Sequence, residues 1–360
     1  MGTLRTLFAI SVVCTHTVGF MFVGGRNAVQ MFYMISGFLI SYVLIEKRSY
    51  TSILKFYVSR YLRLYPIYIV VAVLTLVFLL VTRSGSRNLE FFNAYHDAPL
   101  AADVLLIFSN TVLFLQDWIM FLGVEKGDLV FSSDWSKSEV VLFGGLLVPQ
   151  AWTLGVELTF YLLAPFVLTQ KRAILLLLFI SIAIRFYLIQ IGVGWSDPWS
   201  YRFFPTELAF FLLGSLAHQL LLPFFRTTMP PALLFTSSKV ATGVLVLITI
   251  SYGQIPLAEP VRSLMLFSLF LLLMPLAFVF QEGRDWDKWV GDLSYPIYIC
   301  HLFVVAVVTE GMSHTGKLDN AFLAIITVIL SIFFSLFLNA YVARPVEVLR
   351  KRFRNVQTST

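Results

Sequence analysis

Long apolar runs recur along the whole chain of 360 residues and constrain its fold more than any other feature. A helix needs roughly 17 to 25 apolar residues to cross the hydrocarbon core of a bilayer. Ten runs come near that length: 4–23, 28–45, 66–82, 152–169, 173–191, 205–222, 240–256, 261–280, 293–310 and 321–343. A membrane barrel would instead show short segments of alternating hydropathy. The sequence therefore predicts an all-α, polytopic membrane bundle of about ten transmembrane helices.

Composition supports a membrane protein. Only 13% of the residues are charged and 58% are hydrophobic, whereas a soluble domain carries about 25% charged residues. Both cysteines, Cys14 and Cys300, lie within apolar runs, so we expect two buried thiols and neither a disulfide nor a cysteine metal site. The run 4–23 contains His16 and is followed at once by a second span, which favours a retained helix over a cleaved signal peptide.

The positions of Lys and Arg predict the orientation. Basic residues gather in the loop between the second and third spans and again after residue 343. Ten alternating spans place both clusters, and most of the 26 basic residues, on the cytoplasmic side. Both termini are then cytoplasmic, as expected for a multi-pass protein of a bacterial inner (plasma) membrane. The net charge of +6 indicates loops facing anionic lipid and not nucleic-acid binding.

The segment 83–151 fits this alternation poorly. Residues 101–122 are apolar enough to insert, but counting them as a full span would invert everything after them. We therefore place 83–151 outside, with 101–122 and 139–148 as interfacial or re-entrant helices. Residues 1–353 form one membrane domain, and the polar residues 354–360 form a C-terminal tail.

Several titratable residues fall within the spans, where a charge at the helix centre costs about 2.5 to 3.5 kcal/mol and usually faces a cavity or a partner. They are His16, Glu157, Arg185, Glu207, His218, His301 and Glu310. Imidazole titrates near neutral pH, so His16 could take a proton from a hydroxyl. From position alone, a packed histidine bonded to a neighbouring helix is somewhat more common. Glu207 and His218 receive no functional role.

Arg60 and Arg63 are three residues apart and so share one helix face. Pro66 follows, and proline suits the first turn of a helix, here the third span. Two guanidinium groups at the cytoplasmic mouth of a bundle could clamp phosphates. On spacing alone, ordinary anchoring at the cytoplasmic surface is the more common explanation.

The segment WTLGVELTFYLLAP, Trp152 to Pro165, places Glu157 near the outer start of a span. Its carboxylate could orient His16 or bind a sugar hydroxyl, or it could simply pair with Arg185 or another basic side chain. Ser36-Gly37-Phe38 lets helix backbones approach closely, which is first a packing signal. His301 lies in SYPIYICHLF, where Pro296 is expected to kink or start the span. No spacing of His, Asp and Glu resembles a zinc site, and no hydrolase, P-loop or dinucleotide motif is present.

Five segments in order resemble the membrane acyltransferase-3 family, the integral-membrane O-acetylases of bacterial surface polysaccharides. The family opens with an Arg, ten residues and a His, matched by Arg5 to His16. The later matches are FYMISGFLI (32–40), RYLRLYP (60–66), WTLGVELTFYLLAP (152–165) and SYPIYICH (294–301), and YVARPVEVLRKRF resembles the basic exit. Two departures, Leu158 in place of a second acidic residue and Ala343-Arg344 in place of Glu-Arg, argue against assigning a subfamily or an acceptor by analogy.

The resemblance implies a cytoplasmic acyl-CoA donor, usually acetyl-CoA, no metal, and an acceptor sugar in the outer half of the membrane. His16 would be the base or acyl relay, and Glu157 would assist it. Arg60 and Arg63 would hold the donor's phosphates, with Arg5 a weaker candidate. The matched motifs also supply the predicted substrate-binding residues Trp152, Ser36 and His301. With no soluble hydrolase-like domain appended, transfer would be completed within the membrane domain.

Two other classes remain open from the residues alone. A polytopic transporter or exporter of a small or acylated solute also has ten helices and buried charges, although no two halves of this sequence mirror each other. A lipid-modifying membrane O-acyltransferase would pair a His with an Asn on neighbouring helices, and no matching motif surrounds Asn339. Dependence on acyl-CoA separates an enzyme from a transporter.

Overall fold

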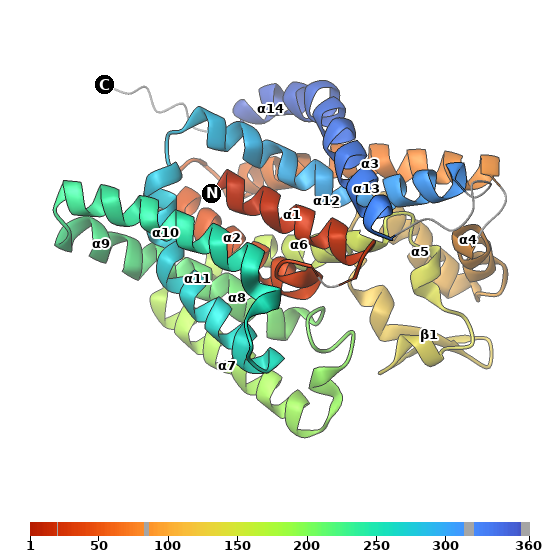
Figure 1. The fold of residues 1–360 in the computed structure, drawn as a ribbon. Coiled ribbons are helices and arrows are strands. Elements are labelled where there is room, and N and C mark those ends of the chain that lie inside the picture. The colour runs from red at the N-terminus through yellow and green to blue at the C-terminus, as the bar shows by residue number, and fades with distance from the viewer. Residues whose placement is uncertain (20, 83–85, 313–319, 354–360) are drawn as a thin grey trace.

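The computed structural model describes the chain apart from residues 20, 83–85, 313–319 and 354–360, so the predicted polar tail 354–360 lies outside the described residues. The chain folds as a helical bundle with one small hairpin (Figure 1). Its helices are α1 (Gly2–Thr15), α2 (Gly24–Ser41), α3 (Ile53–Thr82), α4 (Ser86–His96), α5 (Leu100–Val112), α6 (Trp152–Val167), α7 (Lys171–Gln190), α8 (Phe204–Leu216), α9 (Leu222–Thr228), α10 (Pro231–Ser251), α11 (Glu259–Gln281), α12 (Asp285–Gly311), α13 (Asn320–Leu338) and α14 (Arg344–Lys351).

Three segments of π-helix extend or join these helices. Tyr42–Glu46 continues α2, Ala217–Leu221 joins α8 to α9, and Asn339–Ala343 joins α13 to α14. With these extensions, eight helices in the described residues are long and apolar enough to cross a bilayer. The helix α1 has 14 residues and α6 has 16, both shorter than a usual span. A helical membrane bundle is therefore confirmed, while the number of ten spans and the side of the termini stay predictions.

The first helix is shorter than the predicted span 4–23. It ends at Thr15, His16 forms its C-cap, and Gly19 follows at a φ of 86°. A left-handed glycine just beyond the last turn is a common helix end, and it turns the chain back toward α2. His16 consequently lies at the tip of α1, not inside a continuous helix.

The sequence predicts that Pro66 starts a span and that Pro296 kinks or starts one. Pro66 does not start the third span, because α3 begins at Ile53 and Pro66 lies inside it. Pro296 likewise lies within α12. The predicted spans covered only the most apolar stretch of each helix. The first part of α3, with Lys55, Arg60 and Arg63, and the first turn of α12, with Asp285 and Asp287, extend beyond these stretches.

The segment 101–151 differs from the two predicted interfacial helices. Only α5 is a regular helix, and residues 139–148 contain a short 3₁₀ turn, Leu142–Gly145. Between them lies an antiparallel hairpin of β1 (Leu122–Glu125) and β2 (Asp128–Phe131), in which Leu122 pairs with Phe131. Apolar residues of α5, β1 and the 3₁₀ turn form a second, small hydrophobic core. Figure 1 shows this unit at one side of the bundle, beside α4.

The helices α1 and α2 form the centre of the bundle. The helix α1 packs along α12 and α2, and α2 packs along α8. At the second contact Gly37 of α2 faces the carbonyl of Phe211, and Gly214 of α8 faces the carbonyl of Met34. A Cβ atom at either glycine would lie 1.9 Å from that oxygen, so only glycine permits this approach. The predicted packing role of the Ser36-Gly37-Phe38 segment is confirmed.

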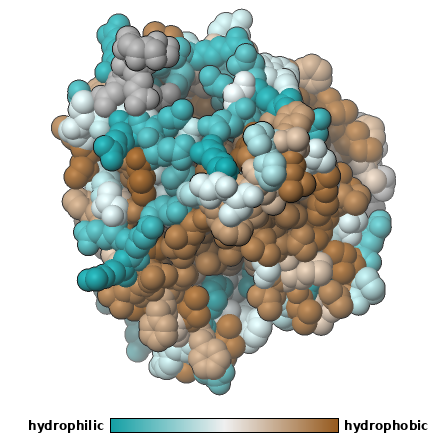
Figure 2. Space-filling model, turned by 90° about the vertical axis from the view of Figure 1, so that its left-hand side faces the viewer, coloured by the Kyte–Doolittle hydropathy of each residue, from teal (hydrophilic) through white to brown (hydrophobic). Residues whose placement is uncertain are grey.

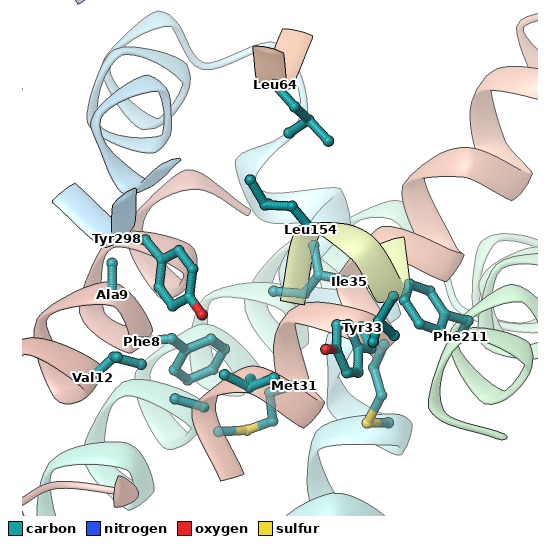
Figure 3. Close-up of a cluster of buried hydrophobic side chains, with 14 of the residues drawn as sticks. Phe8, Ala9, Val12, Met31, Tyr33, Ile35, Leu64, Leu154, Phe211 and Tyr298 are labelled. Atoms are coloured by element: carbon teal, nitrogen blue, oxygen red, sulfur yellow. The ribbon is translucent and has the colours of Figure 1, made fainter. Parts of the chain in front are cut away.

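The interior is apolar and aromatic. Phe8 and Val12 of α1, Met31 and Ile35 of α2, and Tyr298 of α12 belong to one buried cluster (Figure 3). Both cysteines are buried and free, as predicted. The helix α7 instead exposes large apolar side chains such as Phe179 and Phe186, and only 17% of its most hydrophobic stretch is buried. An exposed apolar helix of this kind suits contact with lipid.

The two ends of the described chain meet on one side of the bundle. The start of α1, the early part of α3 and α14 line one common pocket. A chain that crosses the membrane an even number of times, as predicted, would have both ends on the same side. Figure 2 views the left-hand side of Figure 1, the side of α9, and shows hydrophilic residues gathered on the upper part of this face beside a broad hydrophobic area.

Candidate active site

A cavity between α1, α2, α3, α6 and α12 brings together most of the predicted site residues. It contains about 740 Å³ of space not filled by atoms. Its walls include Arg5, Ser36, Arg60, Arg63, Glu157 and Tyr161. These residues come from four of the five matched sequence motifs, which lie far apart in the chain, so the cavity gives those motifs a common physical location.

Glu157 occupies the α6 wall of this cavity. The hydroxyl of Ser36 donates a hydrogen bond to its carboxylate at 2.7 Å, and the hydroxyl of Tyr161, one turn further along α6, donates another. The expected alternative, an ion pair with Arg185, is wrong, because Arg185 pairs with Glu207 at 2.5 Å. Neutral hydroxyl donors fix the carboxylate in place while leaving its charge in the cavity.

Three arginines, Arg5 of α1 and Arg60 and Arg63 of α3, also line the cavity. Arg60 is 4% exposed and donates to the Tyr50 hydroxyl at 2.7 Å. Arg5 and Arg63 are close enough to Glu157 to feel its charge. Among the described residues, however, no ion pair joins any of the three arginines to a carboxylate. The cavity therefore carries excess positive charge that an anionic ligand could neutralise.

The cavity continues to the end of the bundle where α3, α12 and α14 begin or finish. Arg5 and Arg63 also line two neighbouring pockets that open toward this end. The wall of one pocket adds the basic residues Lys288, Arg344, Arg350 and Lys351 and the acidic residues Asp292 and Glu347, so it is basic on balance. The wall of the other adds Arg284 together with the acidic residues Glu282, Asp285 and Asp287. A long ligand with an anionic head could thus bind at the mouth and extend inward past Arg63.

The opposite end of the cavity reaches aromatic residues of α2 and α12. Phe32 and Tyr298 line it, and their ring centroids are 6.0 Å apart. The Tyr298 hydroxyl donates to the carbonyl of Gln150 at 3.0 Å and accepts a hydrogen bond from Thr153 at 2.9 Å. These bonds attach α12 to the start of α6, and Tyr298 separates the cavity from the residues beyond it.

His16 and His301 lie beyond Tyr298, outside the cavity wall. The centroids of their imidazole rings are 5.1 Å apart, and the ring of Tyr298 is 6.0 Å from that of His301. His16 is exposed at the tip of α1, whereas His301 is completely buried. Among the described residues, no hydrogen bond joins His16 to Glu157. Of the two predicted catalytic residues, Glu157 lines the cavity and His16 does not.

Trp152 lies beneath a charged residue. It is 5% exposed, and the guanidinium of Arg202 lies over its ring, 4.4 Å from the centroid. Asp197 accepts two hydrogen bonds from Arg202, at 2.5 and 2.9 Å, and holds it there. Arg202 also exerts an electrostatic effect on His16. A ligand approaching Trp152 from this side would meet Arg202 first.

Sequence reasoning gave no role to several residues of the cavity wall. Tyr33, Tyr161 and Tyr298 line the cavity and lie within three of the matched motifs, but each is an aromatic residue of an apolar span and was not singled out. The hydroxyl of Tyr33 has no hydrogen-bond partner among the described residues. In Figure 3 it points, like that of Tyr298, into the middle of the buried cluster. Arg202 was missed because its loop has no helical pattern.

Asp117, between α5 and β1, is another buried acid that sequence reasoning missed. It is 3% exposed, and a Cβ atom built on Gly155 of α6 would lie 2.4 Å from its carboxylate oxygen. Burial raises the pKa of Asp117 to about 7, although two backbone N–H groups act in the opposite direction. This carboxyl packs against α6 half a turn from Glu157. No group of three or more His, Cys, Asp or Glu within the described parts of the chain could hold a metal ion.

The comparisons with known proteins agree with the motifs. Residues 2–342 match the profile of a family described as an acyltransferase domain. The chain is 22% identical over 341 residues to the peptidoglycan O-acetyltransferase OatA of Listeria monocytogenes. That alignment covers 87% of this chain and 50% of OatA, so the chain spans about half the length of this relative. No solved structure matches the chain significantly.

Proposed function

The chain belongs to the membrane acyltransferase-3 family, and we propose that it moves an acyl group, most simply acetyl, from cytoplasmic acyl-CoA to a hydroxyl of a cell-surface polysaccharide or its lipid-linked precursor. One observation carries this proposal. Arg5, Arg60 and Arg63, which have no carboxylate partner among the described residues, line one cavity, and Arg5 and Arg63 also line an adjacent basic pocket. Tyr298 of the cavity wall lies beside His301, which in turn lies beside the exposed His16.

The proposed binding of the acyl-CoA donor is based on the charge of the pockets and on the shape of coenzyme A. Coenzyme A has a phosphate-rich head and a long, thin pantetheine arm that ends in the thioester. The basic mouth suits the head, since guanidinium groups bind phosphates through paired hydrogen bonds. The narrow cavity beyond Arg63 suits the arm. The thioester would then lie near Tyr298, with water largely excluded, which protects it from hydrolysis.

The reaction needs a base close to the acceptor hydroxyl. His16 takes the proton from this hydroxyl, and the hydroxyl oxygen attacks the thioester carbonyl carbon. When the tetrahedral intermediate collapses, the carbon–sulfur bond breaks and the thiolate of coenzyme A takes the proton from His16. Glu157, held by Ser36 and Tyr161, accepts a hydrogen bond from the ligand in the cavity. A motion of the Tyr298 side chain would open a path between the cavity and His16.

A glycan acceptor is the simplest partner for the exposed side. His16 is accessible at the tip of α1, near the Trp152–Arg202 pair. The similar OatA is named for O-acetyl transfer to peptidoglycan, which makes a bacterial envelope glycan the class to test first. Trp152 would then support the acceptor through Arg202, which covers its ring.

Purified protein in nanodiscs with radiolabelled acetyl-CoA and a bacterial envelope glycan tests this function. We expect wild-type protein to release CoA and to label the glycan. His16→Ala should lose both reactions by about 10²-fold or more, and His96→Gln, a change at an exposed histidine of α4, should retain them. Wild-type turnover in His16→Ala would refute the role of His16. Movement of label across the bilayer without CoA release would favour a transporter.

A further inference from the structure

His301 makes one hydrogen bond that determines which of its nitrogens carries the proton. Its Nδ1 lies 2.6 Å from the backbone carbonyl oxygen of Tyr298. A carbonyl can only accept, so Nδ1 must donate. In a neutral imidazole the other nitrogen, Nε2, is then an acceptor. The backbone of α12 therefore presents His301 as a hydrogen-bond acceptor through Nε2.

That acceptor has no partner within the described parts of the chain. His301 is 0% exposed, and its Nε2 receives no hydrogen bond. A buried polar atom without a partner costs about 1 to 3 kcal/mol, so the site favours any donor that can approach. Because its ring has no exposed surface, His301 is placed to act on a neighbouring side chain, while its predicted contact with substrate stays a prediction.

The nearest ring with an N–H to donate belongs to His16. The two centroids are 5.1 Å apart and the rings are tilted by 36°. At this separation the facing nitrogens of two imidazoles can come within about 3 Å, an ordinary hydrogen-bond length, after a small rotation of the exposed ring. The His16 side chain is free to make this rotation, since α1 has already ended at Thr15.

We propose that His301 is a positioning residue that accepts a hydrogen bond from one ring N–H of His16 and thereby fixes the tautomer of His16. The other His16 nitrogen then carries the lone pair and faces the acceptor hydroxyl. This inference rests on the role of His16 in the proposed function. A neutral acceptor suits both steps of the reaction, because neutral His16 and its protonated form each keep an N–H for His301.

Two substitutions separate hydrogen bonding from packing. His301→Gln places an amide oxygen near the position of Nε2 and preserves an acceptor, whereas His301→Phe fills the space without one. Cys300→Ala is the matched control, because Cys300 is equally buried on the same turn of α12 but faces Ser331 and Ser335. Each variant is first checked for monodisperse elution, and kcat and KM are then measured for acetyl-CoA and for the glycan.

We expect His301→Phe to lower kcat by about 10²-fold with little change in either KM, since positioning acts on the chemical step. His301→Gln should recover at least tenfold of this loss, and Cys300→Ala should stay within threefold of wild type. An equal loss in the Gln and Phe variants, both folded, would overturn the proposal. A rise in the glycan KM with unchanged kcat would instead show direct substrate binding.

The tautomer is measured separately from activity. The chain has five histidines, so ¹⁵N-histidine labelling with His16→Gln as the assignment reference identifies the His16 signals. One tautomer of His16 should dominate in wild type and in His301→Gln, and a mixture should appear in His301→Phe. A His16 spectrum that His301→Phe leaves unchanged would overturn the inference. This readout needs no turnover, so it remains valid even if the chain uses a donor other than acyl-CoA.

Discussion

Two carboxylates within the bundle, Glu157 and Glu207, have opposite surroundings. Glu207 of α8 is 0% exposed and forms an ion pair with Arg185 of α7 at 2.5 Å. Gln30 of α2 donates to both of its oxygens, at 3.3 and 3.2 Å. Glu157 lies at a cavity wall and receives hydrogen bonds from the hydroxyls of Ser36 and Tyr161. Within the described parts of the chain, the arginines of this cavity have no carboxylate partner.

The difference teaches how to distinguish structure from function among buried charges in a membrane. At Glu207 charge and hydrogen bonds are satisfied by the protein itself, and the ion pair joins α7 to α8. At Glu157 the neighbouring cations remain available to a ligand. A residue type that is costly in a membrane thus indicates a site only when its partners leave a charge unmatched beside a cavity.

Breaking the ion pair between Glu207 and Arg185 should have the largest effect, and this effect should be on the free energy of unfolding. Glu207→Ala leaves the Arg185 guanidinium without its partner in a largely apolar setting, which costs about 3 to 5 kcal/mol. Thermal unfolding in detergent should show a large fall in midpoint, and the double variant with Arg185→Leu should recover part of it. If Glu207→Ala retained wild-type stability but lost turnover, Glu207 would belong to the site instead.

Glu157→Gln should instead lower activity and leave stability nearly unchanged. The amide oxygen can still accept bonds from Ser36 and Tyr161, so the unfolding midpoint should stay within about 1 kcal/mol of wild type. Loss of the negative charge should lower acyl transfer by about 10²-fold, equivalent to about 2.7 kcal/mol. A stable variant with full activity would make Glu157 a structural residue like Glu207.

The arginines should affect donor binding. Arg60→Ala and Arg63→Ala should each raise the KM for acetyl-CoA about tenfold, or about 1.4 kcal/mol. Acetyl-pantetheine, which lacks the nucleotide head, provides the decisive control, because both penalties should disappear with it. Arg172→Ala, on the exposed start of α7, should change neither KM. Equal penalties with both donors would show that the two arginines hold the fold and not the phosphates.

The smallest effect is expected at Ser36. Ser36→Ala removes the 2.7 Å bond to Glu157 while Tyr161 still holds the carboxylate. One hydrogen bond contributes about 1 kcal/mol, so kcat should fall by roughly fivefold. A loss as large as that of Glu157→Gln would mean that Ser36 itself takes part in the reaction.

The sequence predicted the residues of the cavity better than the segments around it. Four motifs indicate Arg5, Arg60, Arg63, Ser36 and Glu157, and the structure places all five around one cavity. Hydropathy was sufficient to predict a helical membrane bundle. It could not locate the end of α1, because the turn at Gly19 depends on local backbone geometry and not on apolar content.

Other features depend on contacts between distant segments. Nothing near Glu207 in the sequence indicates that Arg185, on the preceding helix, reaches it across a loop. Arg202 over Trp152 and His301 beside His16 likewise become visible only after folding. Hydropathy also favoured helices over 101–122 and 139–148; α5 covers the first part of 101–122, whereas 139–148 contains only a short 3₁₀ turn, and a hairpin and a small separate core lie between and beside them.

The glycine contact between α2 and α8 has a consequence for how substrates enter. Gly37 and Gly214 bring the two backbones together without intervening side chains, so a lipid chain has no gap through which to pass between these helices. In the proposed reaction, a lipid-linked acceptor would not enter between α2 and α8 but would reach His16 at the exposed tip of α1. A donor bound at the basic pocket would then approach by a separate route.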